Sequence, residues 1–361
     1  MTDPVVGLST PVFSIDGELA RDLARDCVRL EVEEGLDGLR TMKAHFVAVD
    51  GGATGPPDPM LYVDGKVIDF GKPIEVSVGA DDTQRTVFDG VVSGLELVLG
   101  DSEPPRMVVF AEDALMRLRM TRRMRTYTRV TDADIVGQVA REHGLESDAS
   151  LKGPQYDVVQ QLNQSDLAFL RERARLVQAE LWCTGRTLHF RSRTSRRGSA
   201  LTLVQGNQLL WSRVMADLAH QRSEVVVTGY DATKKEVIDQ RAGKDTVKAE
   251  AAQGRTGPEI LAKALGNSTT LRVRETALNG DEALAWARAE MLRRARGFVT
   301  VSGVAKGAPD MVVGSVLRLE LIGAPFEGDG YYVTQVCHTF DHVQGLRTRF
   351  EAERPTLNEV N

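Results

Sequence analysis

The chain has 361 residues, of which 42% are hydrophobic and 27% are charged, and its formal net charge is −6. This length is enough for two or three domains with buried cores, and the acidic balance argues against a protein that binds nucleic acid or anionic membrane over its whole surface. The three cysteines, Cys27, Cys183 and Cys337, are far apart and show no metal-ligand spacing, which argues against a cysteine-based metal site and predicts free thiols in a reducing compartment.

Residues 1–112 are expected to form mainly strands. Apolar and charged side chains alternate from Val28 to Val32, as they do in a half-buried strand. Similar patterns predict five strands, over 28–32, 43–49, 74–78, 87–99 and 106–110. Five strands around one core are typical of a small barrel or a strongly curved sheet. We therefore expect a first β-barrel, tube-like domain at 1–112.

Residues 113–200 show helical patterns instead. Thr131 and Asp134 have the spacing of a capping box, and Gly144 is placed to end the helix that follows. Ser165 is a good N-cap for a second helix, and residues 181–190 predict a strand, a tight turn and a strand. These elements predict a compact α+β middle domain.

Residues 201–352 return to a strand-rich pattern. Strands are expected over 223–230, 298–305, 315–322, 331–340 and 346–352. Residues 231 to about 280, between the first two of these strands, are poor in large apolar side chains, which predicts an insertion with little core of its own. Asn279 or Asp281 can cap a helix at its end. We expect a second β-barrel tube domain at 201–352, with the insertion at about 231–296, and a C-terminal tail at 353–361.

The two strand-rich regions resemble each other. In the first, a glycine-bounded strand over 71–79 precedes Phe88-Asp89-Gly90, and in the second a glycine-bounded strand over 314–323 precedes Phe326-Glu327-Gly328. Five strands correspond in order, with 28–32 matched to 223–230. The alternative is that short alternating strands resemble one another by necessity. A duplicated module would let three chains present six modules to a sixfold tube.

Two segments carry a resemblance to a known family. The first is QLNQSDLAFLRERAR, from Gln161 to Arg175, followed by Glu180-Leu181-Trp182 and Leu188-His189-Phe190. The second is FEGDGYYVTQVCH, over 326–338, which leads to a strand ending near Phe350-Glu351. Both segments are similar to the phage late control D family, the baseplate hub proteins of contractile phage tails. That family is related to the hub part of the VgrG spikes of type VI secretion and also occurs in extracellular contractile injection systems.

The resemblance implies a structural baseplate hub rather than an enzyme, with no cofactor. It implies a homotrimer that adapts the sixfold inner tube of a phage tail or contractile injection system to a threefold spike. The expected partners are the inner tube protein, a separate spike protein and baseplate wedge proteins, with neither nucleic acid nor membrane bound by this chain alone. Because the sequence has no signal-peptide pattern and no apolar run long enough to span a bilayer, we expect synthesis in the cytoplasm before assembly into the particle.

The residues expected at subunit interfaces lie on strands of the two modules and on basic faces. The strand candidates are Ile74, Val76, Phe88, Val91, Leu317, Leu319, Tyr332 and Val333, and the basic candidates are Arg117, Arg122, Arg123, Arg171 and Arg173. The run from 117 to 129 holds six arginines and no acidic residue. One interpretation is a strip that docks on acidic wedge proteins. The alternative is a nucleic-acid-binding adaptor, which would bind DNA in a salt-dependent manner.

An enzymatic alternative rests on Ser102, Asp217 and His220. The sequences Gly100-Asp101-Ser102 and Asp217-Leu218-Ala219-His220 imitate two blocks of SGNH esterases, in which a histidine oriented by an aspartate activates the serine. The block with the oxyanion-hole asparagine is not evident, and residues 103–105 favour a hairpin loop over the start of a helix. We therefore expect no catalytic, cofactor-binding or metal-binding residues.

Overall fold

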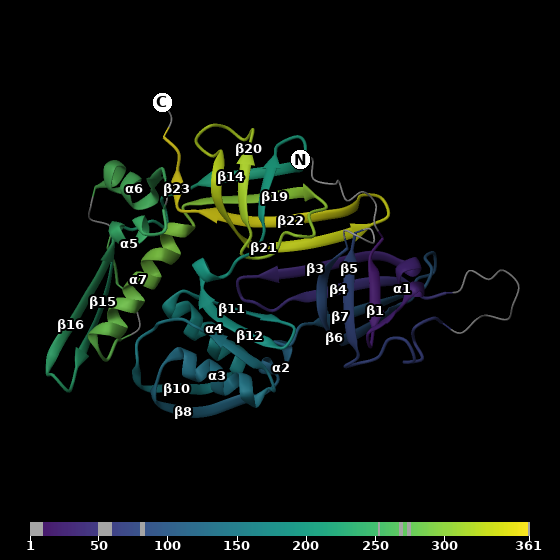
Figure 1. The fold of residues 1–361 in the computed structure, drawn as a ribbon, viewed down its shortest axis with the longest axis horizontal. Coiled ribbons are helices and arrows are strands. Elements are labelled where there is room, and N and C mark those ends of the chain that lie inside the picture. Colours follow the sequence, from purple (N-terminus) through teal and green to yellow (C-terminus); the bar gives the residue numbers. More distant parts are fainter. Residues whose placement is uncertain are drawn as a thin grey trace, which may run out of the picture.

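The computed structural model describes residues 10–49, 60–79, 84–251, 253–266, 270–272 and 276–359. Two β modules lie side by side, a middle domain of helices and small sheets packs beneath them, and an insertion stands at the far end from the first module (Figure 1). This arrangement confirms the expected fold class, mainly β with an α+β middle domain. No helix in these described ranges is long and apolar enough to cross a membrane.

The first module is built around one antiparallel set of strands. Its elements are β1 (Val12–Ile15), β2 (Glu18–Leu19), α1 (Arg21–Asp26), β3 (Cys27–Gly35), β4 (Thr41–Val47), β5 (Pro73–Val78), β6 (Arg85–Val98) and β7 (Arg106–Glu112). Neighbouring strands pair in the order β3-β4-β7-β6-β5-β1-β2. Inward positions alternate along β4, where Met42, Ala44 and Phe46 are buried. The rings of Phe13 and Phe46 meet edge to face in the core, with centroids 5.2 Å apart.

The second module repeats this pairing order. Its strands are β13 (Ala200–Val204), β14 (Leu209–Ala216), β19 (Val299–Lys306), β20 (Val316–Glu320), β21 (Gly328–Asp341) and β22 (Gly345–Arg354). They pair in the order β14-β19-β22-β21-β20-β13, which matches β3-β4-β7-β6-β5-β1 strand for strand. The modules differ at the last strand, because β1 is antiparallel to β5 whereas β13 is parallel to β20.

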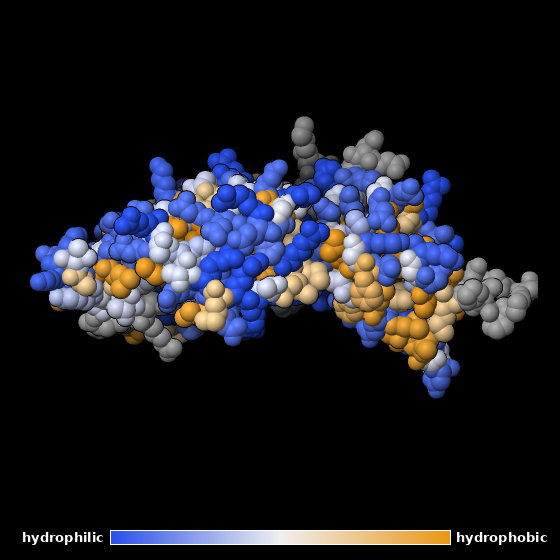
Figure 2. Space-filling model, turned by 90° about the horizontal axis from the view of Figure 1, so that it is seen from below, coloured by the Kyte–Doolittle hydropathy of each residue, from blue (hydrophilic) through white to orange (hydrophobic). Residues whose placement is uncertain are grey.

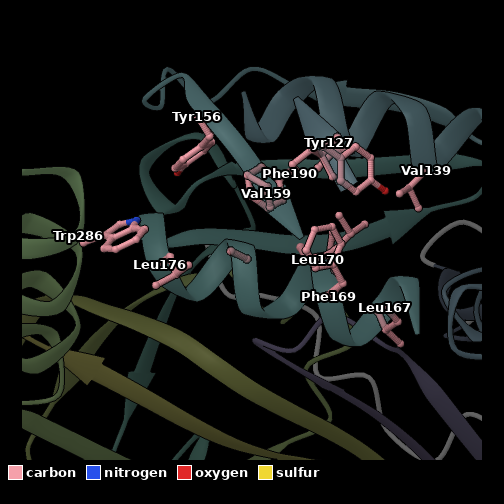
Figure 3. Close-up of a cluster of buried hydrophobic side chains, with 14 of the residues drawn as sticks. Tyr127, Val139, Tyr156, Val159, Leu167, Phe169, Leu170, Leu176, Phe190 and Trp286 are labelled. Carbon is pink, nitrogen blue, oxygen red and sulfur yellow. The ribbon is translucent and has the colours of Figure 1, made fainter. Parts of the chain in front are cut away.

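The middle domain joins helices to two small sheets. Its elements are α2 (Met116–Arg119), β8 (Arg122–Val130), α3 (Asp132–Glu142), β9 (Glu146–Ala149), β10 (Tyr156–Ser165), α4 (Asp166–Val177), β11 (Ala179–Thr184), β12 (Thr187–Ser192) and the short 3-10 helix Arg193–Ser195. The predicted helix starts are confirmed: Thr131 and Asp134 form a capping box, and the Ser165 hydroxyl accepts a backbone N–H of α4. Tyr127 and Phe169 stack in the core, with ring centroids 5.7 Å apart (Figure 3).

The insertion between β14 and β19 shares a core with the middle domain. Its elements are β15 (Glu224–Asp231), β16 (Glu236–Gly243), α5 (Lys244–Lys248), β17 (Arg255–Thr256), α6 (Gly257–Leu265), β18 (Thr270–Arg272) and α7 (Gly280–Arg296), and β17 pairs with β23 (Thr356–Leu357). Asn279 caps α7, as predicted. Trp286 of α7 lies on the side of α4 that carries Leu176 (Figure 3), and Val225 and Ile238 belong to the same buried cluster. The insertion is therefore better packed than its composition predicts.

The first strand of the second module is not where the sequence pattern places it. Residues 223–230 are predicted for this role, but they form β15, which pairs with β16 and β18 in the insertion. The strand beside β19 is β14. Because Leu210, Trp211 and Met215 are exposed on β14, this strand lacks the alternation that identifies a half-buried strand. The insertion therefore begins near residue 224 rather than 231.

The shared Phe-acid-Gly phrase is also not a structural match. Phe326-Glu327-Gly328 leads into β21, whereas Phe88-Asp89-Gly90 lies inside β6 and pairs with β5. The glycines before the two strands do correspond. Gly71 and Gly314 both have positive φ, +78° and +95°, a backbone conformation that favours glycine. The repeat is thus carried by strand pairing and backbone conformation rather than by the turn sequence.

The two modules form one continuous sheet. Besides pairing with β22, β21 pairs with β3, so that Gln335 lies opposite Gly35 and Asp341 opposite Arg29. Phe340 of the second module is buried in the core of the first. In the part of the chain that the structure describes, no ladder closes either module into a complete barrel. Each module is therefore an open sheet within a single chain.

Candidate subunit interface

A buried ion-pair cluster holds the junction between the two modules and the middle domain. Arg196 lies between Glu34 of β3 and Glu180 of β11, and its Nη1 is 3.2 Å from Glu180 Oε2. Arg193 approaches the other Glu180 oxygen at 3.1 Å and also pairs with Glu353 of β22. These four pairs connect the first module, the middle domain and the second module directly.

Aromatic rings cover the cations of this cluster. The guanidinium of Arg196 lies 4.5 Å from the ring centroid of Trp182, and that of Arg193 lies 4.2 Å from the ring centroid of Tyr332. Burial disfavours the charge of Arg193, but the Glu353 and Glu180 carboxylates and Tyr332 together outweigh burial and raise the pKa of the guanidinium. Buried charges that are paired in this way favour one fixed geometry, since each loses its partner if the domains move apart.

A neutral histidine lies on β21 at the same junction. His338 is 3% exposed, its Nε2–H donates to the Met311 carbonyl at 3.1 Å, and its Nδ1 accepts from the Thr348 hydroxyl at 3.0 Å. This pairing assigns the proton to Nε2. Burial lowers the pKa of His338 to about 4. Both ring nitrogens are thus occupied by protein groups, and no cluster of His, Cys, Asp and Glu among the described residues is arranged to hold a metal ion.

Two strand edges are unpaired in the described chain. β14 pairs along one edge with β19, and β6 pairs with the β5 segment no further than Val92, so its edge from Gly94 onward has no partner there. Both edges carry exposed large apolar side chains: Leu97 and Leu99 on or just after β6, and Leu210, Trp211 and Met215 on β14. Figure 2 shows hydrophobic surface gathered on the end of the molecule that carries the first module. A free edge with apolar side chains is a ready template for another strand.

The strand residues predicted at subunit interfaces lie mostly inside single modules. Ile74, Val76, Phe88, Leu317, Leu319 and Val333 are at most 1% exposed, whereas Val91 and Tyr332 are partly buried. The first three belong to the core of the first module, and the next three to that of the second. Their side chains stabilise the modules from within. A role for these residues at a subunit interface stays a prediction.

The predicted basic residues are mostly engaged within the chain. Arg123 pairs with Asp166, Arg171 with Asp37 and Arg173 with Asp132, Arg122 donates to the Asn163 carbonyl, and Arg117 is exposed. Guanidinium groups that are already paired offer less charge to DNA than the sequence suggests. Docking of this strip on wedge proteins stays a prediction.

The residues of the esterase alternative are not connected. Ser102 lies in the hairpin turn between β6 and β7, while Asp217 and His220 follow β14 in the second module. The Asp217 carboxylate accepts the backbone N–H of Ala219 at 2.9 Å. No hydrogen bond or ion pair of the described residues joins these three side chains, so the single chain does not assemble the relay that this chemistry needs.

The residues that form the junction are not predicted from the sequence. Glu34, Glu180 and Arg196 come from three distant segments, and no local pattern brings them together. One signal was present: Glu34 occupies an inward position of β3, where the alternation of Leu30 and Val32 predicts an apolar residue. A charged residue at such a position indicates a buried partner.

Comparison with known proteins gives a family match over most of the chain. Residues 14–342 match the family described as Alg8 N-terminal domain. None of the curated proteins compared matches the chain in sequence.

Solved structures share the fold at low sequence identity. The 43 kDa tail protein of prophage MuSo2 from Shewanella oneidensis has a TM-score of 0.67 and 13% identity, over 96% of this chain and 98% of that one. The tail protein from Neisseria meningitidis MC58 has a TM-score of 0.62 and 11% identity, over 96% of both chains. The E. coli c3393 protein, described as a component of the type VI secretion system with structural similarity to T4 bacteriophage tail proteins gp27 and gp5, has a TM-score of 0.57 and 13% identity, over 93% of this chain and 76% of that one. The predicted resemblance to tail and hub proteins is confirmed at the level of fold.

Proposed function

We propose that this chain, which belongs to the Alg8 N-terminal domain family, is a structural baseplate hub of a contractile phage tail or contractile injection system, because it shares its fold with phage tail proteins and carries a duplicated β module. In this role a homotrimer adapts the sixfold inner tube to a threefold spike. Three chains supply six β modules for the sixfold face. The middle domain and the insertion occur once in each chain, which suits a threefold face.

The shared pairing order of the two modules carries this proposal. Each chain presents two units with the same strand order along one continuous sheet. A sixfold partner bound to a threefold assembly needs six near-equivalent contacts, and a duplicated module inside each subunit supplies them. The ion-pair cluster of Arg193 and Arg196 supports the same role, because its pairs with Glu34, Glu180 and Glu353 connect both modules through the middle domain.

The proposed partners follow from this symmetry. The inner tube protein stacks on the ring of modules, a separate spike protein binds the opposite face, and wedge proteins surround the hub. A symmetry adaptor of this kind needs no cofactor, no DNA and no membrane. It performs no catalysis.

Mass measurement and tube binding test the proposal together. Sedimentation of the purified chain should give roughly three times the 39.6 kDa of one chain, and the inner tube protein from the same gene neighbourhood should co-sediment with this species. A β-rich protein of similar charge serves as the control for non-specific association. A monomer without affinity for the tube protein would contradict the proposed function.

Docking of wedge proteins has its own test. Replacing Arg117, Arg122 and Arg123 by Gln should leave the trimer and tube binding intact while wedge proteins are lost from the assembly. The matched control is Arg21→Gln, which removes one exposed positive charge at the start of α1 in the first module. Normal assembly of the triple variant would remove the basic strip from the proposal.

A further inference from the structure

The long strands β6 and β21 correspond residue by residue. β6 shifts register against β7 just before Gly94, and β21 shifts register against β22 just before Gln335. A bulge bends a strand at a defined residue, so a shared bulge fixes the alignment of the two strands. Counting on from the bulge, Leu97 is the counterpart of His338.

Hydrogen bonds beside these bulges support the same alignment. Gly71 donates its N–H to the Val92 carbonyl at 2.8 Å, and Gly314 donates its N–H to the Val333 carbonyl at 3.0 Å. The acceptors, Val92 and Val333, each lie two residues before the first paired residue after the bulge, which is Gly94 in β6 and Gln335 in β21. The geometry of β5 and β20 at the edge of the long strand is therefore repeated as well.

The strands β3 and β14 also correspond. β3 shifts register against β4 just before Arg29, and β14 shifts register against β19 just before Trp211. Counting on from these bulges, Val214 is the counterpart of Val32. Two pairs of strands are thus aligned independently, β6 with β21 and β3 with β14.

Within one chain, the edge of β21 beyond its bulge is covered by β3. Gln335 to Asp341 runs antiparallel to the segment from Gly35 back to Arg29, with His338 opposite Val32. Along this ladder the inward side chains of β21 are sealed: Val336 is 2% exposed, and His338 and Phe340 are each 3% exposed.

Among the described residues, no strand pairs with the same edge of β6. Leu97 and Leu99 are 37% and 60% exposed, although their counterparts His338 and Phe340 are buried. Both exposed residues are leucines, which are costly to leave in water.

The edge of β14 is open in the same way. Among the described residues, β14 forms a ladder only with β19, apart from a single bridge between Gln205 and Leu209. Its inward residue Ala216 is exposed, although the counterpart on β3, Glu34, is 4% exposed. Its counterpart β3 pairs on both sides, with β4 and with β21. The single chain therefore contains one complete junction between modules and the two unmatched halves of another.

We propose that the free edge of β6 pairs with β14 of a second copy of this chain, in the register that β21 and β3 use within one chain. Residues 94–100 of one copy then run antiparallel to 211–217 of the next, with Leu97 opposite Val214. The inference rests on the proposed hub function and deepens it, because it specifies the strands and the register by which one subunit meets another.

This pairing completes the burial that the single chain leaves unfinished. Leu99 takes the place that Phe340 has at the internal junction, where Phe340 enters the core of the adjoining module. The contact joins different strands of the two copies, so it is heterologous and produces a closed ring when the rotation between units closes. Since internal and intermolecular junctions would share one geometry, three chains would form a ring of six modules.

Paired cysteines test the register. In a Cys337→Ser background, which removes the least buried native thiol, Leu97→Cys and Val214→Cys place two thiols opposite each other across the proposed ladder, within reach of a disulfide. Mild oxidation should link neighbouring chains, and non-reducing gels should show covalent dimers and closed trimers. The matched control is Leu97→Cys with Met215→Cys, whose thiols lie on opposite faces of the sheet and should not cross-link.

A second measurement does not depend on cysteine chemistry. Leu97→Lys combined with Leu99→Lys should weaken the trimer at least tenfold in sedimentation, while the circular dichroism of the subunit stays unchanged. Val343→Lys is the control, because Val343 is 93% exposed in the turn between β21 and β22 and lies outside both edges. Its trimer should form normally.

The outcomes separate this inference from the function on which it rests. A trimer that binds the tube protein but cross-links both cysteine pairs equally, or neither, overturns the register and leaves the hub function standing. A trimer that tolerates the two lysines on β6 also overturns it. A chain that remains monomeric and does not bind the tube protein removes the hub function together with the interface.

Discussion

The two β modules share a frame but differ in what interrupts it. Between its first two core strands, the first module has a short turn over residues 36–40, whereas the corresponding connection of the second module, over 217–298, contains the insertion. Pairing order and bulges are nevertheless the same in both. Backbone pairing therefore fixes the order and register of the strands. The connections at the strand ends differ in length between the modules, and they form the contacts with the middle domain.

The largest effect is expected where the turn of the first module touches the middle domain. Gly38 has a φ of +86°, and a Cβ at this position would lie 1.8 Å from the carbonyl oxygen of Leu181. Gly38→Ala should therefore lower the free energy of unfolding by roughly 4 kcal/mol in urea titrations, from backbone strain and overpacking combined. Gly17→Ala is the control, since Gly17 has a φ of +81° and open space around it, and it should cost about 1 kcal/mol. Equal losses at the two sites would mean that the contact with Leu181 is unimportant.

The next effect comes from a charge that the second module lacks. Glu34 is buried between Arg196 and Arg40, whereas its counterpart on β14 is the exposed Ala216. Glu34→Ala should lower the free energy of unfolding by roughly 3 kcal/mol, because it leaves two arginines short of a buried partner. Glu33→Ala, at an exposed neighbouring position, should cost less than about 1 kcal/mol. Similar denaturant midpoints for Glu34→Ala and Glu33→Ala would show that the buried ion pairs of Glu34 do not stabilise the first module.

A pH-dependent difference should distinguish His338 from its counterpart Leu97. Burial lowers the pKa of His338 to about 4 from 6.5, so the unfolded chain binds a proton that the folded chain does not. Stability from this group is present above pH 6.5 and is lost as pH falls toward 4. The free energy of unfolding of the wild type, relative to that of His338→Gln, should fall by about 2 kcal/mol between pH 7 and pH 5.

The wild type must be compared with His338→Gln because a second group, Asp113, changes the free energy of unfolding with pH in the opposite direction. Burial raises the pKa of Asp113 to about 7, so its contribution to stability rises as pH falls over the same range. Asp113 is present in both proteins, and its contribution cancels in the difference. A difference that is constant between pH 7 and pH 5 would show that His338 is not held neutral by the fold.

The smallest effect is expected on the free edge. At protein concentrations low enough to dissociate subunits, Leu99→Ala should change the free energy of unfolding by less than about 0.5 kcal/mol. Phe340→Ala, at the buried counterpart, should cost about 3 kcal/mol under the same conditions. A large loss at Leu99 in the dissociated subunit would place this side chain in the core of its own module and weaken the proposed role of the edge.

Local signals made the helices predictable from sequence. Thr131, Ser165 and Asn279 each satisfy free amides of the next helical turn, and all three cap the helices that the sequence predicts. The duplication could also be predicted from a local signal at Gly71 and Gly314. Both residues have positive φ, a backbone conformation that favours glycine, so the same residue type occurs before the corresponding strand in each module. Such signals depend on neighbours along the chain.

Long-range pairing explains the features that the sequence did not predict. The ladder between Arg29 and Asp341 joins residues from opposite ends of the chain, and nothing near either residue specifies the other. β14 was missed because Trp211 and Met215 face outward. On the proposed interface the opposite face of β14, which carries Val214 and Ala216, is covered by another molecule, so its pattern depends on a partner outside the single chain.

The long strand β21 also determines when the molecule can be completed. Phe340 and Leu346 belong to the core of the first module, which otherwise consists of residues from 13 to 111. A ribosome must therefore translate past residue 346 before the first-made module can finish folding. Prematurely terminated chains therefore keep an unfinished first module with an uncovered β3 edge.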